Sequence, residues 1–355
     1  MGDLRRSAKA GCGPQPTRNS RTPTAVSESI VRMFPSSAQA AQVRRQRASN
    51  SPIPPCRSVS LRRQALGILL MSWILTGSCA ANRSRHGDTL RVRGSDTMLM
   101  LAQGWAESYL TVDPTVAVEV SGGGSGQGIA ALEKGNIDIA NCSRNLKPEE
   151  AAEARKNTGK DPQEFVVGYD ALAVFVHREN PLEEITLSQL AEIYKVGGNL
   201  SQWSQLGARI PTGRDRIVRV NRQSSSGTYE FFRDHVLNKE DFQLGSLDMN
   251  GSKEVVELIA STPGAIGYSG MAFATVDVKV LRVRGAAGQE AYAPTVSNVL
   301  SRHYPISRSL LMYTLGEPSP KVRKYLDWVR SPAGQQIVAD VGYVPIAADG
   351  NGVTN

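Results

Sequence analysis

Three loops of the sequence combine glycine with hydroxyl side chains in a way that can hold an anion. They cover residues 93–98, 120–128 and 220–229, and each follows an apolar run and precedes a helical pattern. Backbone N–H groups at a helix start bind oxyanions, and glycine lets the backbone come close to a ligand. A fourth loop, 141–145, adds a serine and an arginine. Together the four loops predict an oxyanion site.

Other interpretations of these loops have less support. Taken singly, each loop could simply cap a helix, because Ser, Thr and Asp are common at that position. The serine run 224–226 could hold a nucleophile or form a flexible linker, but it lacks the pattern G-x-S-x-G, and His235 is expected on the exposed side of a helix. No Walker lysine follows the glycine-rich loops, and no cluster has metal-ligand spacing. We therefore expect no catalytic residue, no metal and no cofactor.

Short apolar runs alternate with helical patterns from Asp88 onward, without an internal repeat. Helices are expected within 97–110 and 146–157, for example, and 164–180 contains two β-rich pieces in close succession. This strand–loop–helix repetition predicts α/β layers around a largely parallel sheet. In such sheets ligands bind at the C-terminal ends of the strands, where all four loops are expected.

The formal charge of +8 is unevenly distributed. Residues 1–78 hold 12 of the 41 basic side chains and two of the 33 acidic ones, which leaves 29 basic and 31 acidic side chains in the remainder. The basic character therefore belongs to an N-terminal leader. We expect no broad surface for nucleic acid.

The leader has the composition of a disordered segment followed by a signal peptide. Residues 1–57 are rich in Ser, Pro and Arg and too polar to fold. The apolar run 65–76 is too short for a permanent membrane helix but suits a signal-peptide core. The residues before Cys79 resemble a bacterial lipoprotein box, although Leu75 lies four residues before the cysteine instead of three. We expect lipidation of Cys79; the alternative is ordinary secretory cleavage beside an incidental cysteine.

Cys142 is the one cysteine of the globular part, because the other three belong to the leader and its cleavage site. It cannot form an internal disulfide there, and no CxxC pair exists for zinc. We expect it to be a small buried apolar residue.

The motifs, taken in order, resemble those of the PstS-like phosphate-binding proteins, a branch of the type II periplasmic binding proteins that serve phosphate ABC transporters. The resemblance runs from about Thr89 to Ala347. It is carried by GSDTM, GGGSGQGI, DIANCSRNLKPEE, YDALAVFVHRENP, LSQLAEIYKVGGNLSQW, VNRQSSSGTYEFF, TPGAIGYSG, YPISRSLLMYT and SPAGQQIVADVGYVPI. The order of these strings makes the resemblance far more specific than any one loop.

The resemblance implies a type II periplasmic-binding-protein fold, in which a two-strand hinge joins two α/β lobes around a ligand cleft. Lobe 1 would comprise 88–172 and 270–347, and lobe 2 would be the inserted segment 173–269. The residues expected to hold phosphate, carried over by position, are Ser95, Thr97, Met98, Ser125, Ser143, Arg144, Arg222, Ser226, Gly227 and Thr228. A buried dianion needs hydrogen bonds to nearly every oxygen, and an arginine can donate two charge-assisted ones.

The sequence departs from the best-known members at two positions. They have an aspartate, which accepts the proton of hydrogen phosphate, where this chain has Arg144. Asp96 is a candidate for that role; the alternative is a helix cap that points away from the ligand. They also have an acid beside the arginine where this chain has Ser224, so Arg222 loses a local orienting partner.

The function implied is capture of inorganic phosphate and its delivery to the permease and ATPase of an ABC importer. The protein is expected to be a monomer and a membrane-anchored lipoprotein of the periplasm or cell surface. One alternative is a binding protein for another tetrahedral oxyanion, such as sulfate, molybdate or arsenate. Another is a phosphate sensor or scavenger without a permease, and a third is a phosphoesterase that uses Ser226.

Overall fold

The computed structural model describes residues 88–286 and 288–346. The predicted disordered leader and signal peptide, 1–78, and the predicted lipidation site Cys79 lie outside the described residues. Among the helices that are described, none is long and apolar enough to cross a membrane.

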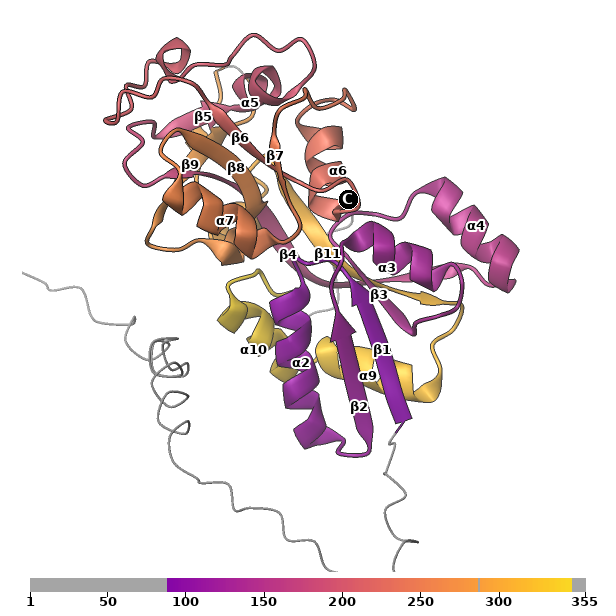
Figure 1. The fold of residues 1–355 in the computed structure, drawn as a ribbon. Coiled ribbons are helices and arrows are strands. Elements are labelled where there is room, and N and C mark those ends of the chain that lie inside the picture. The colour runs from indigo at the N-terminus through magenta and orange to yellow at the C-terminus, as the bar shows by residue number, and fades with distance from the viewer. Residues whose placement is uncertain (1–87, 287, 347–355) are drawn as a thin grey trace, which may run out of the picture. The chain divides into compact units, whose positions relative to one another are not determined.

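A sheet of eleven strands organises the described residues (Figure 1). Eight strands follow the order β2-β1-β3-β11-β4-β8-β6-β7, while β9 pairs with β4, β5 and β10. The strands are β1 (Asp88–Gly94), β2 (Val116–Ser121), β3 (Ile139–Cys142), β4 (Pro162–His177), β5 (Glu184–Thr186), β6 (Val218–Arg222), β7 (Leu247–Met249), β8 (Ala265–Gly270), β9 (Val278–Arg284), β10 (Ala291–Tyr292) and β11 (Ser307–Leu315).

Helices connect these strands and cover both faces of the sheet. They are α2 (Leu99–Val112), α3 (Ser125–Leu132), α4 (Pro148–Thr158), α5 (Leu187–Tyr194), α6 (Gly227–His235), α7 (Ser252–Ser261), α8 (Val296–Leu300), α9 (Pro320–Val329) and α10 (Pro332–Val341), with the short 3-10 turns η1 (Trp203–Leu206) and η2 (Met271–Phe273).

Local sequence signals set several helix ends. Pro148 occupies the first turn of α4, where its missing N–H costs nothing, and Gly159 ends the helix in the left-handed region at φ 69°. The Thr186 hydroxyl caps α5 by accepting a hydrogen bond from the Gln189 N–H at 3.0 Å. These signals place the loops between strands and helices where the sequence predicted them.

The sheet is mixed, and the prediction of a largely parallel sheet is wrong in this respect. Five pairings are parallel and five are antiparallel. The blocks β1–β2–β3 and β6–β7–β8 contribute four of the parallel pairings. β4 and β11 run antiparallel to each other and to the strands beside them, β3, β8 and β9.

β4 is one continuous strand of 16 residues and not the two pieces that the sequence suggested. No proline follows Pro162 before the strand ends, so nothing interrupts its extended backbone. Its first part pairs with β11 and its last part with β8 and β9, so that both lobes share it. The lobe boundaries at 172 and 270 remain a prediction; the pairing of β9 with the end of β4 favours placing Val278–Arg284 in the inserted lobe.

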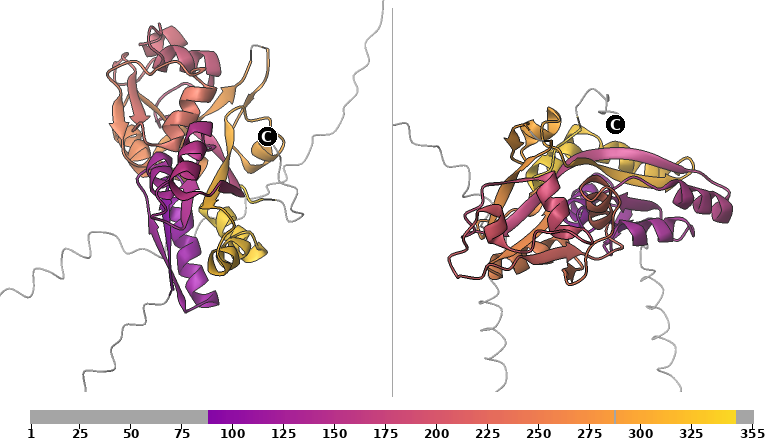
Figure 2. Two further views of the ribbon diagram at one scale, coloured as in Figure 1. Left: turned by 90° about the vertical axis from the view of Figure 1, so that its right-hand side faces the viewer. Right: turned by 90° about the horizontal axis from the view of Figure 1, so that it is seen from above.

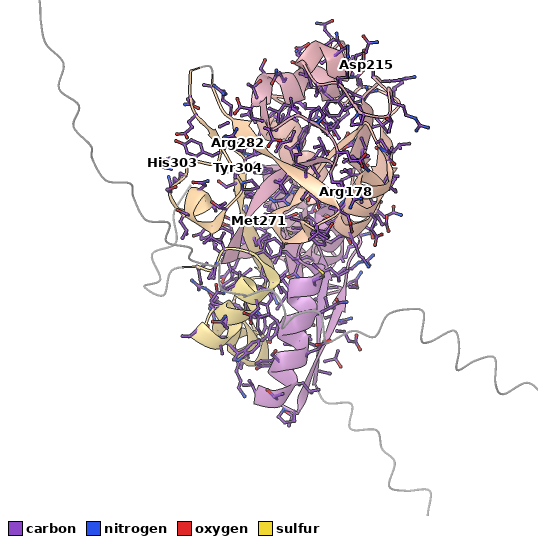
Figure 3. All side chains as sticks on the ribbon, turned by 90° about the vertical axis from the view of Figure 1, so that its left-hand side faces the viewer. Arg178, Asp215, Met271, Arg282, His303 and Tyr304 are labelled. Atoms are coloured by element: carbon purple, nitrogen blue, oxygen red, sulfur yellow. The ribbon has the colours of Figure 1, made fainter. Side chains whose placement is uncertain are left out.

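Each lobe has helices on both faces of its part of the sheet. In the first lobe, α2, α9 and α10 pack together on one face, visible as the indigo and yellow helices in Figure 2, while α3 lies against β1 and β3 on the other. In the second, α7 packs on β4, β6 and β8, and a cluster that includes Tyr194, Phe232 and Tyr268 covers the opposite face. Met271, labelled in Figure 3, packs against both large hydrophobic clusters.

Candidate functional site

The loops after β1, β2, β3 and β6 meet in a cluster of buried hydroxyl groups. Ser95 Oγ donates to Ser143 Oγ at 2.9 Å, and the Ser143 N–H donates to Ser125 Oγ at 3.1 Å. Thr97 Oγ1 and Thr228 Oγ1 lie 2.9 Å apart, which joins the loop after β1 to the start of α6. All five side chains are at most 2% exposed. We call these five residues the hydroxyl cluster.

Glycine at position 227 allows the two sides of the cluster to come together. A Cβ atom there would lie 2.3 Å from Ser125 Oγ and 2.9 Å from Ser143 Oγ, closer than any side chain tolerates. One backbone hydrogen bond spans the same interface, from the Gly126 N–H to the Ser225 carbonyl oxygen at 3.0 Å. Gly227 therefore fits the predicted role of bringing the backbone close to the site.

Arg222 is buried at the end of β6, and it binds Asp96, which lies between Ser95 and Thr97 of the hydroxyl cluster in the sequence. Its guanidinium donates to Ser252 Oγ at 2.8 Å, to the Asn250 carbonyl at 3.0 Å and to Asp96 Oδ2 at 3.1 Å. Its Nε is buried and has no hydrogen-bond acceptor among the described residues. Burial lowers the pKa of Arg222, while the nearby Asp96 carboxylate opposes this effect. Three of the five guanidinium N–H groups are therefore engaged, and the Nε–H is one of the two that remain.

Asp96 is bound from two directions. Its Oδ1 accepts a hydrogen bond from the Gly123 N–H at 2.8 Å, and its Oδ2 accepts the bond from Arg222. Met98, and not Asp96, is the N-cap residue of α2, and no side chain caps that helix. Asp96 thereby supplies the orienting carboxylate that Ser224 does not provide, from the opposite side of the cleft.

Arg308 and Asp170 belong to the same site and were not singled out from the sequence. The two residues lie opposite each other on β11 and β4, and Arg308 Nε and Nη2 donate to Asp170 Oδ2 at 3.0 and 2.8 Å. Arg308 Nη2 also reaches Thr228 Oγ1 at 3.1 Å and Thr97 Oγ1 at 3.3 Å. The available signal was a single charged residue inside each of two otherwise uncharged segments, 306–315 and 165–176.

Three side chains predicted to contact the ligand do not belong to the hydroxyl cluster. The Met98 side chain is fully buried in the hydrophobic core, which leaves only its backbone for a ligand. Ser226 Oγ caps α6 by accepting a bond from the Thr228 N–H at 3.1 Å. Arg144 turns toward Glu150 and Glu230. The other predicted contacts are those brought together at the hydroxyl cluster: Ser95, Thr97, Ser125, Ser143, Arg222, Gly227 and Thr228.

Comparisons with known proteins identify the family. A model of the PBP superfamily domain matches residues 80–333. The phosphate-binding protein PstS of Pseudomonas aeruginosa is 31% identical over 265 residues, which cover 72% of this chain and 82% of the relative. The chain belongs to the PstS-like family of the PBP superfamily.

Other members and solved structures of the family agree with this fold. The phosphate-binding protein PstS of Bacillus subtilis is 31% identical over 75% of this chain and 84% of its own length. A crystal structure of a phosphate ABC transporter substrate-binding protein of Clostridium perfringens, with bound phosphate, matches with a TM-score of 0.65 at 28% identity, covering 73% of this chain and all of that one. An ABC-type phosphate transport receptor of Vibrio cholerae matches with a TM-score of 0.58 at 27% identity, over 72% and 99% of the two chains. The PstS-like chain described here therefore has the type II periplasmic-binding-protein fold.

Proposed function

We propose that this PstS-like protein captures inorganic phosphate in the cleft between its lobes and delivers it to an ABC importer, without chemistry of its own. The observation that carries the proposal is the hydroxyl cluster, to which both lobes contribute. The buried guanidinium of Arg308 contacts this cluster, and that of Arg222 binds Asp96, the residue between Ser95 and Thr97 in the sequence. The names of the relatives from P. aeruginosa and B. subtilis, and the phosphate bound to the C. perfringens protein, support the choice of ligand.

Phosphate would replace the direct hydrogen bonds between hydroxyl groups. Thr97 bonds to Thr228, and Ser95 to Ser143, so each of these four hydroxyls can turn its hydrogen toward an anion placed between them. The buried N–H of Arg222 Nε adds a charge-assisted donor. The N-termini of α3 and α6 add the favourable ends of two helix dipoles. Uncharged donors would thus surround most of the ion.

The charges around the site are balanced before the ion arrives. Arg222 is paired with Asp96, and Arg308 is paired with Asp170. A dianion would therefore be held mainly by hydrogen bonds and helix dipoles, and not by an excess of positive charge. Such a site selects among ligands by its hydrogen-bond donors and acceptors more than by its net charge. It can therefore distinguish oxyanions of similar size that differ in their protons.

We propose that Asp96 accepts the proton of hydrogen phosphate. Each oxygen of Asp96 has one hydrogen-bond donor, whereas a carboxylate oxygen accepts two. Asp170 is less suitable, because it is fully buried behind Arg308 and also accepts the Met271 N–H at 3.0 Å. Sulfate has no proton near neutral pH and would face the Asp96 carboxylate without a hydrogen bond. The site would therefore reject sulfate.

Binding would favour the closed arrangement of the lobes, because only that arrangement brings Thr97 and Thr228 to the same ion. We further propose that lipidation of Cys79 anchors the protein outside the cytoplasm, as a monomer, beside a permease and ATPase that receive the phosphate. The fold and family of 88–346 support a binding role; the anchor and the partners rest on the sequence pattern.

Calorimetric titration of the purified protein with phosphate and with sulfate between pH 5 and 8 tests this proposal. We expect one phosphate per chain with micromolar or tighter Kd, and sulfate weaker by roughly 10⁴-fold, as for sites that leave a buried polar group unpaired with the wrong ligand. Sulfate binding as tight as phosphate would instead indicate a general oxyanion carrier. An absence of phosphate binding would refute the transport function.

A further inference from the structure

Arg144 is the centre of an ion-pair network that crosses between the lobes outside the hydroxyl cluster. Its guanidinium pairs with Glu150 in bidentate geometry, with Nη2–Oε1 and Nη1–Oε2 distances of 2.6 and 2.8 Å. Its Nε lies 2.9 Å from Glu230 Oε2, on α6, as an ion pair that lacks hydrogen-bond geometry. Lys147 forms a second ion pair with Glu230. We call these four residues the interlobe network.

Three of the four side chains of the network are shielded from most of the solvent, while Lys147 is 38% exposed. Arg144 is 7% exposed at its side chain, and Glu150 and Glu230 are each 17% exposed. Two basic and two acidic groups leave no net charge. Burial opposes the charge of Arg144, but the hydrogen bonds and proximity of Glu150, together with Glu230, outweigh this and raise its pKa. Removing one partner of such a shielded pair costs more than removing one partner of an exposed pair, because the remaining charge is left uncompensated.

Only one side of the network is fixed within the first lobe. The Glu150 carboxylate accepts a hydrogen bond from the Lys147 N–H at 2.9 Å, so the start of α4 holds Glu150 and hence Arg144 in place. Glu230 comes from α6 in the other lobe, two residues beyond Thr228. The contacts of Arg144 and Lys147 with Glu230 therefore exist only while the lobes are closed.

We propose that Arg144 is a positioning residue that holds the closed lobes together through Glu230, and not a contact of the bound phosphate. This inference rests on the proposed function, since it assigns a role in retention of the ion. The residue that replaces the family's proton acceptor thus acts on the rate of release. Phosphate recognition stays with the hydroxyl cluster, Arg222 and Asp96.

The network borders a cavity of about 860 Å³ between the start of α4, α6 and the beginning of β11. Arg144, Lys147 and Glu230 line it together with Arg308, which contacts the hydroxyl cluster. Ions that enter this cavity from the solvent would screen the network in part. We therefore expect salt to speed phosphate release by weakening the network.

Whether Glu230→Gln weakens or tightens phosphate binding shows how Glu230 acts. We call the proposed contact of Arg144 with Glu230 the latch, and it predicts the opposite change from direct repulsion of the anion. Glu230 is a negative charge close to an anion site, so its removal would tighten phosphate binding if only direct repulsion mattered. If Glu230 holds the lobes closed, its removal must weaken binding. Glu230→Gln keeps the size of the side chain and leaves Arg144 paired with Glu150, so the fold of α4 should persist.

The experiment is stopped-flow measurement of phosphate association and dissociation in wild type, Glu230→Gln, Arg144→Gln and the double variant. We expect Glu230→Gln to raise the dissociation rate about tenfold with an unchanged association rate, as for loss of a buried charge partner. The double variant should be no worse than Arg144→Gln, because both changes break the same contact. Arg155→Gln is the matched control, because Arg155 pairs with Asp161 on the exposed surface of the same lobe.

Hydrogen exchange at the Gly126 amide reports closure without phosphate. This N–H donates across the interface to Ser225, so its exchange should be faster in Glu230→Gln than in wild type or Arg155→Gln. Unchanged exchange and dissociation, or tighter phosphate binding by Glu230→Gln, would overturn the latch. A loss beyond 1,000-fold in Arg144→Gln alone, with none in Glu230→Gln, would make Arg144 a phosphate contact. Absence of phosphate binding by wild type refutes the proposed function separately, while the exchange measurement still tests the latch.

Discussion

Substitution of Arg222 by glutamine tests the centre of the proposed site. Arg222 is 1% exposed, and its guanidinium links Asp96 from one lobe to Ser252 and the Asn250 backbone in the other. Glutamine keeps some hydrogen-bonding capacity but removes the charge and the unpartnered Nε–H. The substitution therefore removes a proposed hydrogen-bond donor to phosphate and also removes the ion-pair partner of Asp96.

The expected magnitude follows from these contacts. Removal of a charged donor to the ion costs about 1.5–3 kcal/mol, and a carboxylate left unpaired beside an anion adds to that. Truncation of one partner in buried charge pairs typically costs about 2–5 kcal/mol. We expect a loss of about 3–4 kcal/mol in phosphate binding, or a Kd raised roughly 150- to 700-fold at about 1.4 kcal/mol per tenfold.

A second substitution identifies the part of the loss that comes from Asp96. Asp96→Asn alone should weaken phosphate binding, because it removes the proposed acceptor for the ligand's proton. Added to Arg222→Gln, however, it removes the unpaired carboxylate, so the double variant should bind about as well as Arg222→Gln or up to tenfold better. Strictly additive losses would mean that Asp96 and Arg222 act independently, contrary to their 3.1 Å contact.

The assay is calorimetric titration of phosphate into protein freed of bound anion, with thermal unfolding measured in parallel. Arg219→Gln is the control, because Arg219 lies on the same strand but is only partly buried and donates to the Leu244 carbonyl at 2.9 Å, away from the site. It should bind phosphate like wild type. A Kd for Arg222→Gln within fivefold of wild type, in a folded protein, would refute the placement of the site.

Two further substitutions test other parts of the structure. Gly227→Ala would place a Cβ 2.3 Å from Ser125 Oγ, so the lobes must separate slightly; overpacking of about 1–3 kcal/mol should raise the phosphate Kd roughly 5- to 150-fold, and calorimetry that shows no change would contradict the close approach. Cys142 is fully buried, and burial raises the pKa of its thiol, so a disulfide reagent should titrate one more thiol in denaturant than in native protein. The Cys142→Ala variant should show no such difference, and reaction of Cys142 in the native protein would contradict its burial.

The sequence was sufficient to predict the elements that depend on local patterns. Periodicity located the strands and helices, and the Gly, Ser and Thr loops indicated where an anion could bind, because both signals involve residues close together in the chain. The mixed direction of the sheet was missed, since it depends on which distant strands become neighbours. β11 pairs with β4 across more than 130 residues, as in the partners Arg308 and Asp170, and no local pattern specifies that pairing.

Orientation of side chains was the second limit of sequence reasoning. The motif around Arg144 predicted a contact with the ligand, but its direction depends on Glu150 and on Glu230, which lies on another lobe. The role of Asp96 was left open for the same reason. Only the folded chain shows that its carboxylate meets Arg222, 126 positions away.

The continuous strand β4 also limits how the molecule can be divided. The first part of its backbone hydrogen-bonds to β11 and the last part to β8 and β9. The sheet of each lobe therefore includes a part of this one strand. Excising the inserted lobe as a separate fragment would cut this strand and expose unpaired edges on both pieces, which promotes aggregation. A chimera that exchanges lobes between relatives would have to carry β4 and β11 from the same parent. The surfaces of the two lobes can change independently, but a change in β4 or β11 affects both lobes.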